Sequence, residues 1–244
     1  MENIKNKTVA DLVTENIKTA DVFKKHGIDF CCGGGISIEK ACEKYNVSYD
    51  KIIDELNNLK NETTLTNNYN NWKLDFLIDY IVNTHHRYVE DAIPLLKQYG
   101  DKVAKVHGHH YTELLEIKDL IYQVSNELTT HMKKEEIILF PFIKKLFNAK
   151  NENKTVNFPS FGTVNNPIEM MEKEHDEAGS ILKRINELTN GYKTPEGACN
   201  TFKALYSKLE EFEDDLHQHV HLENNILFPK AIVLEIEVKE IKSH

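Results

Sequence analysis

The sequence has few cysteines, and they are too scattered to form a disulfide framework. Its 244 residues contain 4 cysteines, at positions 31, 32, 42 and 199, and none of them forms a Cys-x-x-Cys motif. This pattern argues against a disulfide-stabilised secreted scaffold, a zinc ribbon and a thioredoxin-type motif. It indicates a reducing compartment.

Long apolar runs and basic stripes are also missing. The first residues, Met-Glu-Asn-Ile-Lys-Asn-Lys-Thr, lack the apolar core of a signal peptide, and no segment approaches the roughly 20 apolar residues of a membrane span. Lys and Arg are scattered through a chain of net charge -9, so nothing predicts a phosphate-binding surface. We expect a soluble cytoplasmic protein with no nucleic-acid and no membrane partner.

Strand signals are weak, while helical periodicity recurs, so the expected class is all-α. We expect a small helical domain at 1–58, a polar Asn- and Thr-rich linker at 59–71 and a four-helix bundle at 72–244. The bundle helices are expected at about 72–98, 112–148, 164–189 and 198–235. In the small domain, N-caps are expected at Thr8, Thr19, Ser37 and Ser48.

One eleven-residue pattern occurs twice in the expected bundle. In 131–141 and in 219–229, a histidine is followed four residues later by a glutamate and then by Ile-Leu-Phe-Pro. Residues at this spacing share one helix face, so His131 with Glu135, and His219 with Glu223, can hold one metal ion. A lone histidine precedes each pair, His85 by 46 residues and His175 by 44 residues. The order is typical of two helix hairpins that each bring a histidine opposite a His/Glu pair.

Helical register separates candidate ligands from other polar residues. His85 lies on the apolar stripe of its helix, whereas His86 shares a face with polar residues and is expected to face water. Glu135 lies on a stripe and Glu136 about 100° away from it. That stripe is expected to comprise Ile117, Leu120, Val124, Leu128, His131, Glu135, Ile138 and Phe142. His217 and His221 flank His219 at two residues on either side, so they are expected to point away from the site.

Two glutamates and four histidines inside one bundle predict a metal site. Facing buried carboxylates are costly unless a cation lies between them. A structural zinc site would favour thiolates, whereas these donors suit a non-haem di-iron centre of two iron ions, in which each glutamate bridges and open positions remain. The proline six residues after each glutamate has a simpler interpretation, which is that it shapes the helix end.

These motifs resemble the iron-sulfur cluster repair di-iron proteins, also called repair of iron centres proteins, whose larger domain is hemerythrin-like. The resemblance covers nearly the whole chain. It is carried by Asp-Phe-Cys-Cys-Gly-Gly at 29–34, Asn-Thr-His-His-Arg-Tyr at 83–88, the stretch at 131–141, Glu-His-Asp-Glu-Ala-Gly at 174–179 and Leu-Glu-Asn-Asn-Ile-Leu-Phe-Pro at 222–229.

The resemblance implies a ligand set and several residues near it. The family's iron ligands fall on His85, His131, Glu135, His175, His219 and Glu223, and a further histidine near the iron pair falls on His107. Oxygen-carrying hemerythrins use five histidines, a Glu and an Asp, so the poorer set found here argues against a simple dioxygen carrier.

The remaining candidate residues have both a functional and a purely structural interpretation. Glu127 and Glu174 either relay protons or guide Fe²⁺ near the site, or form exposed salt bridges. Cys31 and Cys32 resemble the family's di-cysteine signature, which implies that they transfer iron or electrons or interact with nitric oxide. The alternative is that they are small residues packed in a tight turn. Cys42 and Cys199 are interpreted as ordinary buried thiols.

Three functions are consistent with these features. The first is repair of iron-sulfur clusters damaged by oxidative or nitrosative stress, with damaged or apo iron-sulfur proteins as partners and iron donation as the mechanism. The second is a nitric oxide reductase acting at the iron pair. The third is a sensor that binds O₂ or NO and moves the cysteine domain. The sequence leaves open whether the chain forms a homodimer.

Overall fold

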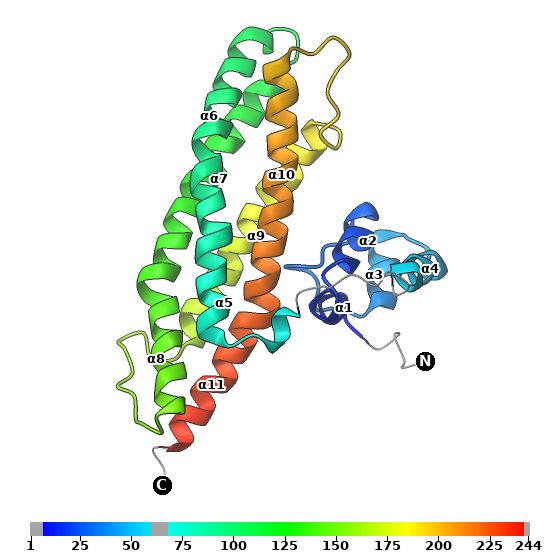
Figure 1. The fold of residues 1–244 in the computed structure, drawn as a ribbon. Coiled ribbons are helices and arrows are strands. Elements are labelled where there is room, and N and C mark those ends of the chain that lie inside the picture. Colours follow the sequence, from blue (N-terminus) through cyan, green and yellow to red (C-terminus); the bar gives the residue numbers. More distant parts are fainter. Residues whose placement is uncertain (1–6, 60–67, 242–244) are drawn as a thin grey trace.

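The computed structural model describes residues 7–59 and 68–241, which are almost entirely helical (Figure 1). Among these residues the β pairing is limited to an isolated bridge between Thr8 and Ser37. The all-α prediction is therefore confirmed. Most of the expected linker at 59–71, and the first six residues of the expected small domain, lie outside the described ranges. Within those ranges no helix has both the length and the apolar character needed to cross a membrane.

The small domain contains four short helices. They are α1 (Val9–Glu15), α2 (Thr19–Lys25), α3 (Ile38–Tyr45) and α4 (Tyr49–Leu59). Thr8 caps α1 as expected: its side chain accepts from the Asp11 N–H, and the Asp11 carboxylate accepts from the Thr8 N–H. Ser37 caps α3 in the same position. The N-cap prediction for Thr19 is wrong, because Thr19 is the first residue of α2 and its hydroxyl donates to the Asn16 carbonyl.

The bundle consists of four long helices, three of which contain a π-helical turn. The first runs through α5 (Leu74–Tyr80), the π turn η3 (Ile81–His86) and α6 (Arg87–His107), after a 3-10 turn η2 (Tyr69–Asn71). The second runs through α7 (Glu113–Lys134), the π turn η4 (Glu135–Leu139) and α8 (Phe140–Asn151). The third is α9 (Asn165–Leu188). The fourth runs through α10 (Asn200–Leu222), the π turn η5 (Glu223–Leu227) and α11 (Phe228–Ile241).

Two bundle helices are longer than expected. The first continues to His107, past the expected end near residue 98, and the fourth continues to Ile241. Gly100 lies inside the first helix at its contact with α7, where an added Cβ would lie only 3.2 Å from the Ile121 Cδ1 atom. Glycine there allows the two helices to approach closely, so it does not end the helix.

The core of the bundle is divided into two apolar clusters. On the first bundle helix Ile81 belongs to one cluster and Val89 to the other, and on the second helix Leu139 and Leu128 are divided in the same way. Between the clusters lies a buried polar layer, formed by His85, His86, His131, Glu135, His175, His219 and Glu223. The polar layer is thus enclosed by apolar packing on both sides along the bundle axis.

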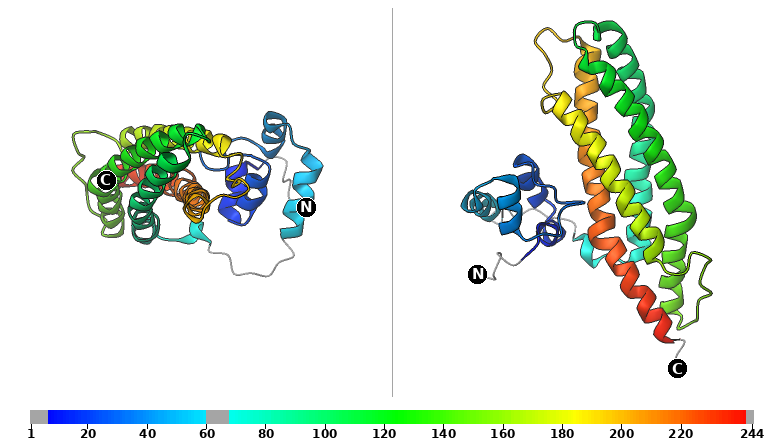
Figure 2. Two further views of the ribbon diagram at one scale, coloured as in Figure 1. Left: turned by 90° about the horizontal axis from the view of Figure 1, so that it is seen from above. Right: turned by 180° about the vertical axis from the view of Figure 1, so that it is seen from behind.

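The small domain lies against α10, on the outer side of the bundle (Figures 1 and 2). Its apolar core is continuous with one of the two bundle clusters. The Phe30 ring meets the rings of His217 and His221 edge-on, with centroids 5.8 and 6.1 Å apart. An ion pair between Lys24 and Asp214 lies nearby. The loop that carries Cys31 and Cys32 is therefore held next to the helix that carries His219 and Glu223.

Candidate metal centre

The π turns place the two glutamates. In η4 the Phe140 N–H donates to the Glu135 carbonyl, and in η5 the Phe228 N–H donates to the Glu223 carbonyl, five residues back in each case. The next residue of each helix is a proline, which has no N–H to continue the α-helical ladder. Both helices then continue, to Asn151 and Ile241, so the interpretation that these prolines shape a helix end is wrong. π turns of this kind occur frequently at functional sites.

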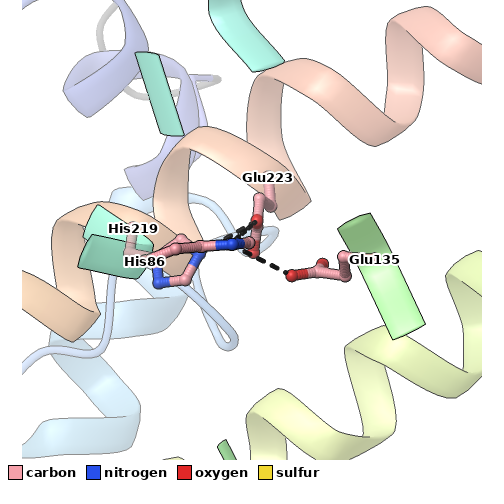
Figure 3. Close-up of side chains that lie close together, drawn as sticks. All are labelled: His86, Glu135, His219 and Glu223. Carbon is pink, nitrogen blue, oxygen red and sulfur yellow. Dashed lines mark hydrogen bonds and ion pairs between the residues drawn. The ribbon is translucent and has the colours of Figure 1, made fainter. Parts of the chain in front are cut away.

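Four helices bring six side chains into two overlapping groups of possible metal ligands. The first group is His86, Glu135, His219 and Glu223 (Figure 3), and the second group is His131, Glu135, His175 and Glu223. In each group the ligand atoms lie within 4.8 Å of one another. Both glutamates belong to both groups, whereas each histidine belongs to one.

The carboxylates lie between the histidines of the two groups. Glu135 Oε2 is 3.4 Å from His86 Nε2 and also 3.4 Å from His131 Nε2. Glu223 Oε1 is 3.0 Å from His219 Nε2, and its Oε2 is 3.2 Å from His175 Nε2. Each glutamate can therefore bridge two cations, one in each group.

Hydrogen bonds to the outer ring nitrogens orient three of the histidines. His86 Nδ1 donates to Glu136 Oε1 (2.7 Å) and His131 Nδ1 to Glu174 Oε2 (2.9 Å). His175 Nδ1 donates to Asn224 Oδ1 (2.8 Å). Such bonds leave the Nε2 lone pairs directed inward, as they are in metal-ligating histidines.

A close contact between two of these lone pairs calls for a cation. The Nε2 atoms of His131 and His175 are only 3.0 Å apart, and the other nitrogen of each ring is already a donor. Either a proton or a metal ion must therefore lie between the two rings to remove the repulsion.

The charge and the unpaired atoms of the centre fit a metal. Both glutamates are 0% exposed, and no hydrogen-bond partner is present for Glu135 Oε1 and Oε2, Glu223 Oε2 or His86 Nε2. Burial alone would raise the pKa of Glu223, yet attraction to His219 and to the nearby His175 ring holds it well below its usual range. Buried carboxylates of this kind need positive charge beside them.

The histidines supply that charge as protons when no metal does. Burial favours the neutral form of His86, but the carboxylates of Glu135 and Glu223, 3.4 and 3.9 Å from its Nε2, outweigh burial and raise its pKa to about 10. The pKa of His131 rises to about 9, because attraction to Glu135 outweighs burial in the same way. A metal ion would replace these protons, so metal binding is expected to release protons.

The expectation that His86 faces water is wrong. His86 is 1% exposed and His85 is 2% exposed. His86 provides a ligand atom to the first group, whereas His85 belongs to neither group and places Nδ1 2.9 Å from Asp215 Oδ1. The physical reason is η3, because a π turn inserts an extra residue and changes the register that a count of 3.6 residues per turn assumes.

The same error occurs after Glu135. Ile138 was expected on the core stripe but is 45% exposed, and Leu139 is buried in its place. The register has moved by one residue within η4. In both helices, a count of 3.6 residues per turn assigns residues inside the π turn to the wrong helix face.

Sequence reasoning named Glu174, which orients His131, but missed the other two residues that orient the ligands. Glu136 follows Glu135 and accepts from His86, and Asn224 follows Glu223 and accepts from His175. The signal was present in the repeat, because the residue after each glutamate is a hydrogen-bond acceptor in both copies.

His217 and His221 point away from the metal-ligand groups, as expected, but His221 is fully buried at the contact with the small domain. Neither belongs to the two groups of possible ligands. Burial lowers the pKa of His221 to about 4, so this ring is neutral. Its place under Phe30 is set by docking of the small domain, which periodicity within one helix does not reveal.

An open cavity of about 300 Å³ leads to the second group. His131, Glu127 and Glu174 line it, together with Lys134, whose ammonium pairs with Glu174. Glu127 Oε1 accepts from the Gln123 amide at 3.0 Å, while its Oε2 is buried with no hydrogen-bond partner. The two candidate glutamates thus lie along a path from solvent to His131.

The structure does not bring His107 near the site. His107 ends α6, 21 residues after His86 in the same chain segment, which corresponds to about 30 Å of helix. Its Nε2 lies 3.3 Å from Cys199 Sγ. The expectation of a histidine near the iron pair at this position is therefore wrong.

The two cysteines of the small domain form a close, asymmetric pair. Cys31 is buried and Cys32 is half-buried, with their Sγ atoms 3.9 Å apart. The hydrogen bond to Cys32, burial and the nearby Asp29 carboxylate together raise the pKa of Cys31 well above its usual range. Cys31 is therefore a protonated thiol, and Cys32 is the more accessible of the two. Cys42 is buried as expected, but Cys199 is exposed, so that expectation is wrong.

Two family descriptions match the chain. Residues 77–231 match the Hemerythrin HHE cation binding domain, and residues 5–60 match ScdA_N, a Domain of Unknown function (DUF542). The first match contains all six residues of the two ligand groups, and the second contains Cys31 and Cys32. The two matches correspond to the bundle and the small domain.

Curated relatives cover almost the whole chain. The iron-sulfur cluster repair protein ScdA of Staphylococcus haemolyticus is 35% identical over 222 residues, which is 91% of this chain and 96% of the relative. ScdA of Staphylococcus epidermidis is 36% identical over 229 residues (93% and 98%). The iron-sulfur cluster repair protein YtfE of Yersinia pseudotuberculosis is 34% identical over 228 residues (93% and 97%).

Proposed function

The chain belongs to the iron-sulfur cluster repair proteins with a hemerythrin cation-binding domain, and we propose that it repairs clusters damaged by oxidative or nitrosative stress by donating iron. Its partners are then damaged or apo iron-sulfur proteins. The four cysteines, all free, support a location in the reducing cytoplasm. The single observation that carries the proposal is the pair of overlapping ligand groups that share both glutamates.

We assign two iron ions to these groups. His86 and His219 would hold the first ion, His131 and His175 would hold the second, and Glu135 and Glu223 would bridge them. This assignment replaces His85 by His86 in the ligand set expected from the sequence. Imidazole with carboxylate suits iron, and two histidines with shared oxygens leave coordination positions open on each ion.

Donation requires a route by which iron leaves the protein. Bound iron would supply an exchangeable, redox-active ion in a centre with open positions. His131 is the one proposed ligand among the residues that line the 300 Å³ cavity, so the second group faces the route out. Glu127 and Glu174 offer carboxylate oxygens along that route, and Lys134 pairs with Glu174. These contacts support release from the second group before the first.

The test is transfer of iron to a damaged cluster. Iron-loaded protein is incubated anaerobically with an apo or nitrosylated iron-sulfur protein, and recovery of the visible cluster absorbance is followed. Faster recovery than with the same amount of free ferrous iron is expected. The Glu135→Gln variant is the matched control, because it keeps the fold but weakens both groups. Recovery no faster than with free iron refutes donation.

The thiol pair has a proposed role in the same reaction. Cys32 is the more accessible thiol, and Cys31 is held protonated beside Asp29. We propose that Cys32 assists the transfer of iron. The Cys32→Ser variant should then slow recovery of the cluster while its own iron content stays at the wild-type value. Cys42→Ser is the control on a buried thiol of the same domain.

Reduction of nitric oxide is the alternative function. It is favoured by two adjacent ligand groups and by a cavity whose glutamates could carry protons to them. Stopped-flow mixing of the ferrous protein with NO distinguishes the two functions. Under the alternative, nitrous oxide is evolved; a stable nitrosyl without gas leaves repair as the function.

A further inference from the structure

Three consecutive residues of η5 contact three different parts of the protein. Glu223 belongs to both ligand groups, and Asn224 accepts from His175. The Asn225 side-chain amide donates to the backbone carbonyls of Phe30 and Cys31, at 3.3 Å in each case, and its nitrogen also lies 2.9 Å from His221 Nδ1. One π turn therefore joins the candidate metal centre to the cysteine loop of the small domain.

The other copy of the repeat shows that Asn225 is not needed to build the centre. In η4, Glu135 belongs to both groups and Glu136 accepts from His86, just as Glu223 and Asn224 do in η5. The third position is Ile137, which is 72% exposed. The same turn thus holds its glutamate with an apolar residue that makes no such contact. The amide of Asn225 instead contacts the cysteine loop and His221, whose ring packs against Phe30.

The cysteine loop has a backbone that can receive this contact as one unit. The Asp29 carboxylate accepts hydrogen bonds from the N–H groups of Cys31 (2.9 Å), Cys32 (3.1 Å) and Gly33 (2.9 Å). These bonds close the loop on itself, so a displacement of its carbonyls moves both thiols. The loop is therefore held to the bundle through Asn225 and through the Phe30 ring.

We propose that Asn225 is a positioning residue that couples metal occupancy at Glu223 to the position of the Cys31–Cys32 loop. The proposal rests on the metal centre proposed above. With metal bound, Glu223 is fixed and η5 keeps Asn225 under the loop, so Cys32 stays half-buried, as it is in this structure.

Loss of metal weakens that arrangement for a physical reason. Without a metal ion, Glu223 loses the bonds that fix its two carboxylate oxygens, so the η5 backbone that carries Glu223 and Asn225 is held less rigidly. The hydrogen bonds from Asn225 to the Phe30 and Cys31 carbonyls are already long, at 3.3 Å each, so a small displacement of η5 breaks them. Asn225 then leaves the two carbonyls and the loop is released. The protein would expose its thiols once its centre has lost iron.

Site-resolved labelling of the cysteines tests this coupling. Wild-type protein is alkylated anaerobically with N-ethylmaleimide in its metal-free and iron-loaded forms, and the rate at each cysteine is measured by peptide mass spectrometry. Cys32 should react at least about fivefold more slowly in the loaded form, the lower end of typical couplings between sites. Cys199, at the far end of the bundle, is the internal reference and should not change.

Two variants separate coupling from simple shielding. In Asn225→Ala the loaded and metal-free rates at Cys32 should become equal, while iron content stays at the wild-type value. Ile137→Ala, at the matching position of the other repeat, should keep the full difference. Protection that persists in Asn225→Ala would mean that iron binds the thiols directly, and it would overturn the proposal.

Wild-type measurements keep the proposal falsifiable if Asn225→Ala does not fold. The amides of Cys31, Cys32 and Gly33 should exchange hydrogen faster in the metal-free form than in the loaded form. Equal exchange and equal labelling in samples that contain iron overturn the coupling alone. Samples that take up no iron overturn both the coupling and the proposed metal centre.

Discussion

Two adjacent histidines provide the sharpest test of the ligand assignment. His85 and His86 are both buried, and each donates from Nδ1 to a carboxylate, His85 to Asp215 at 2.9 Å and His86 to Glu136 at 2.7 Å. Only His86 contributes to a ligand group. Replacement of each by alanine therefore removes the same side-chain volume and the same kind of hydrogen bond. A difference in metal content between the two variants isolates ligation.

The expected magnitudes follow from these contacts. Loss of a hydrogen bond to a charged group costs about 1.5–3 kcal/mol in either variant, and His86→Ala also removes the positive charge beside Glu135 and Glu223, so it should be the less stable of the two in the metal-free form. Loss of an outer hydrogen-bond partner alone weakens metal binding by about 10–100-fold, and loss of a ligand should weaken it more. His86→Ala should therefore lose the first ion and retain about one iron per chain, whereas His85→Ala should retain about two.

The assay combines metal analysis with thermal unfolding. Each variant is loaded with ferrous iron, desalted and analysed for iron per chain, and its melting temperature is measured in the metal-free form. A cooperative melting transition in both metal-free variants, at a lower temperature for His86→Ala, establishes that folded proteins are compared. Equal iron loss in both variants, or full retention in His86→Ala, would refute the reasoning from the π turn.

Two further predictions concern carboxylates. Glu223→Gln should lower the iron content of both groups at once, to well below that of His86→Ala, because the two carboxylate oxygens of Glu223 face His219 and His175. An iron content equal to that of the wild type would show that Glu223 is not a bridge. Burial raises the pKa of Glu213, against a hydrogen bond from Asn186. The folded state therefore holds this proton at higher pH than the unfolded state, and stability is lost as the pH rises through the folded pKa. Glu213→Gln keeps an acceptor for Asn186 and removes the charge, so it should raise the melting temperature by a few degrees at pH 7 but not at pH 4; an equal effect at both pH values would contradict the assignment.

Periodicity correctly predicted the burial of five of the six proposed ligands. His131, Glu135, His175, His219 and Glu223 are all buried, because the α-helical register is regular up to the first residue of each π turn. The choice between His85 and His86 failed because both lie inside η3. A hydrogen-bond pattern of that kind has no signature in apolar spacing.

Contacts outside the repeated His/Glu pattern could not be predicted. His107 was placed near the iron pair by resemblance, but it ends a 21-residue helix that carries it away from the site. His221 is buried by Phe30 of the other domain, and Asn225 binds the cysteine loop. Each of these depends on how separate elements pack, which the pattern within one helix does not contain.

Anomalous diffraction at the iron edge tests the central claim most directly. Crystals of the iron-loaded wild-type protein should show two peaks about 3.5–4 Å apart, both between Glu135 and Glu223, with one beside His86 and His219 and the other beside His131 and His175. A single peak, or two peaks that do not share the two glutamates, would contradict the account.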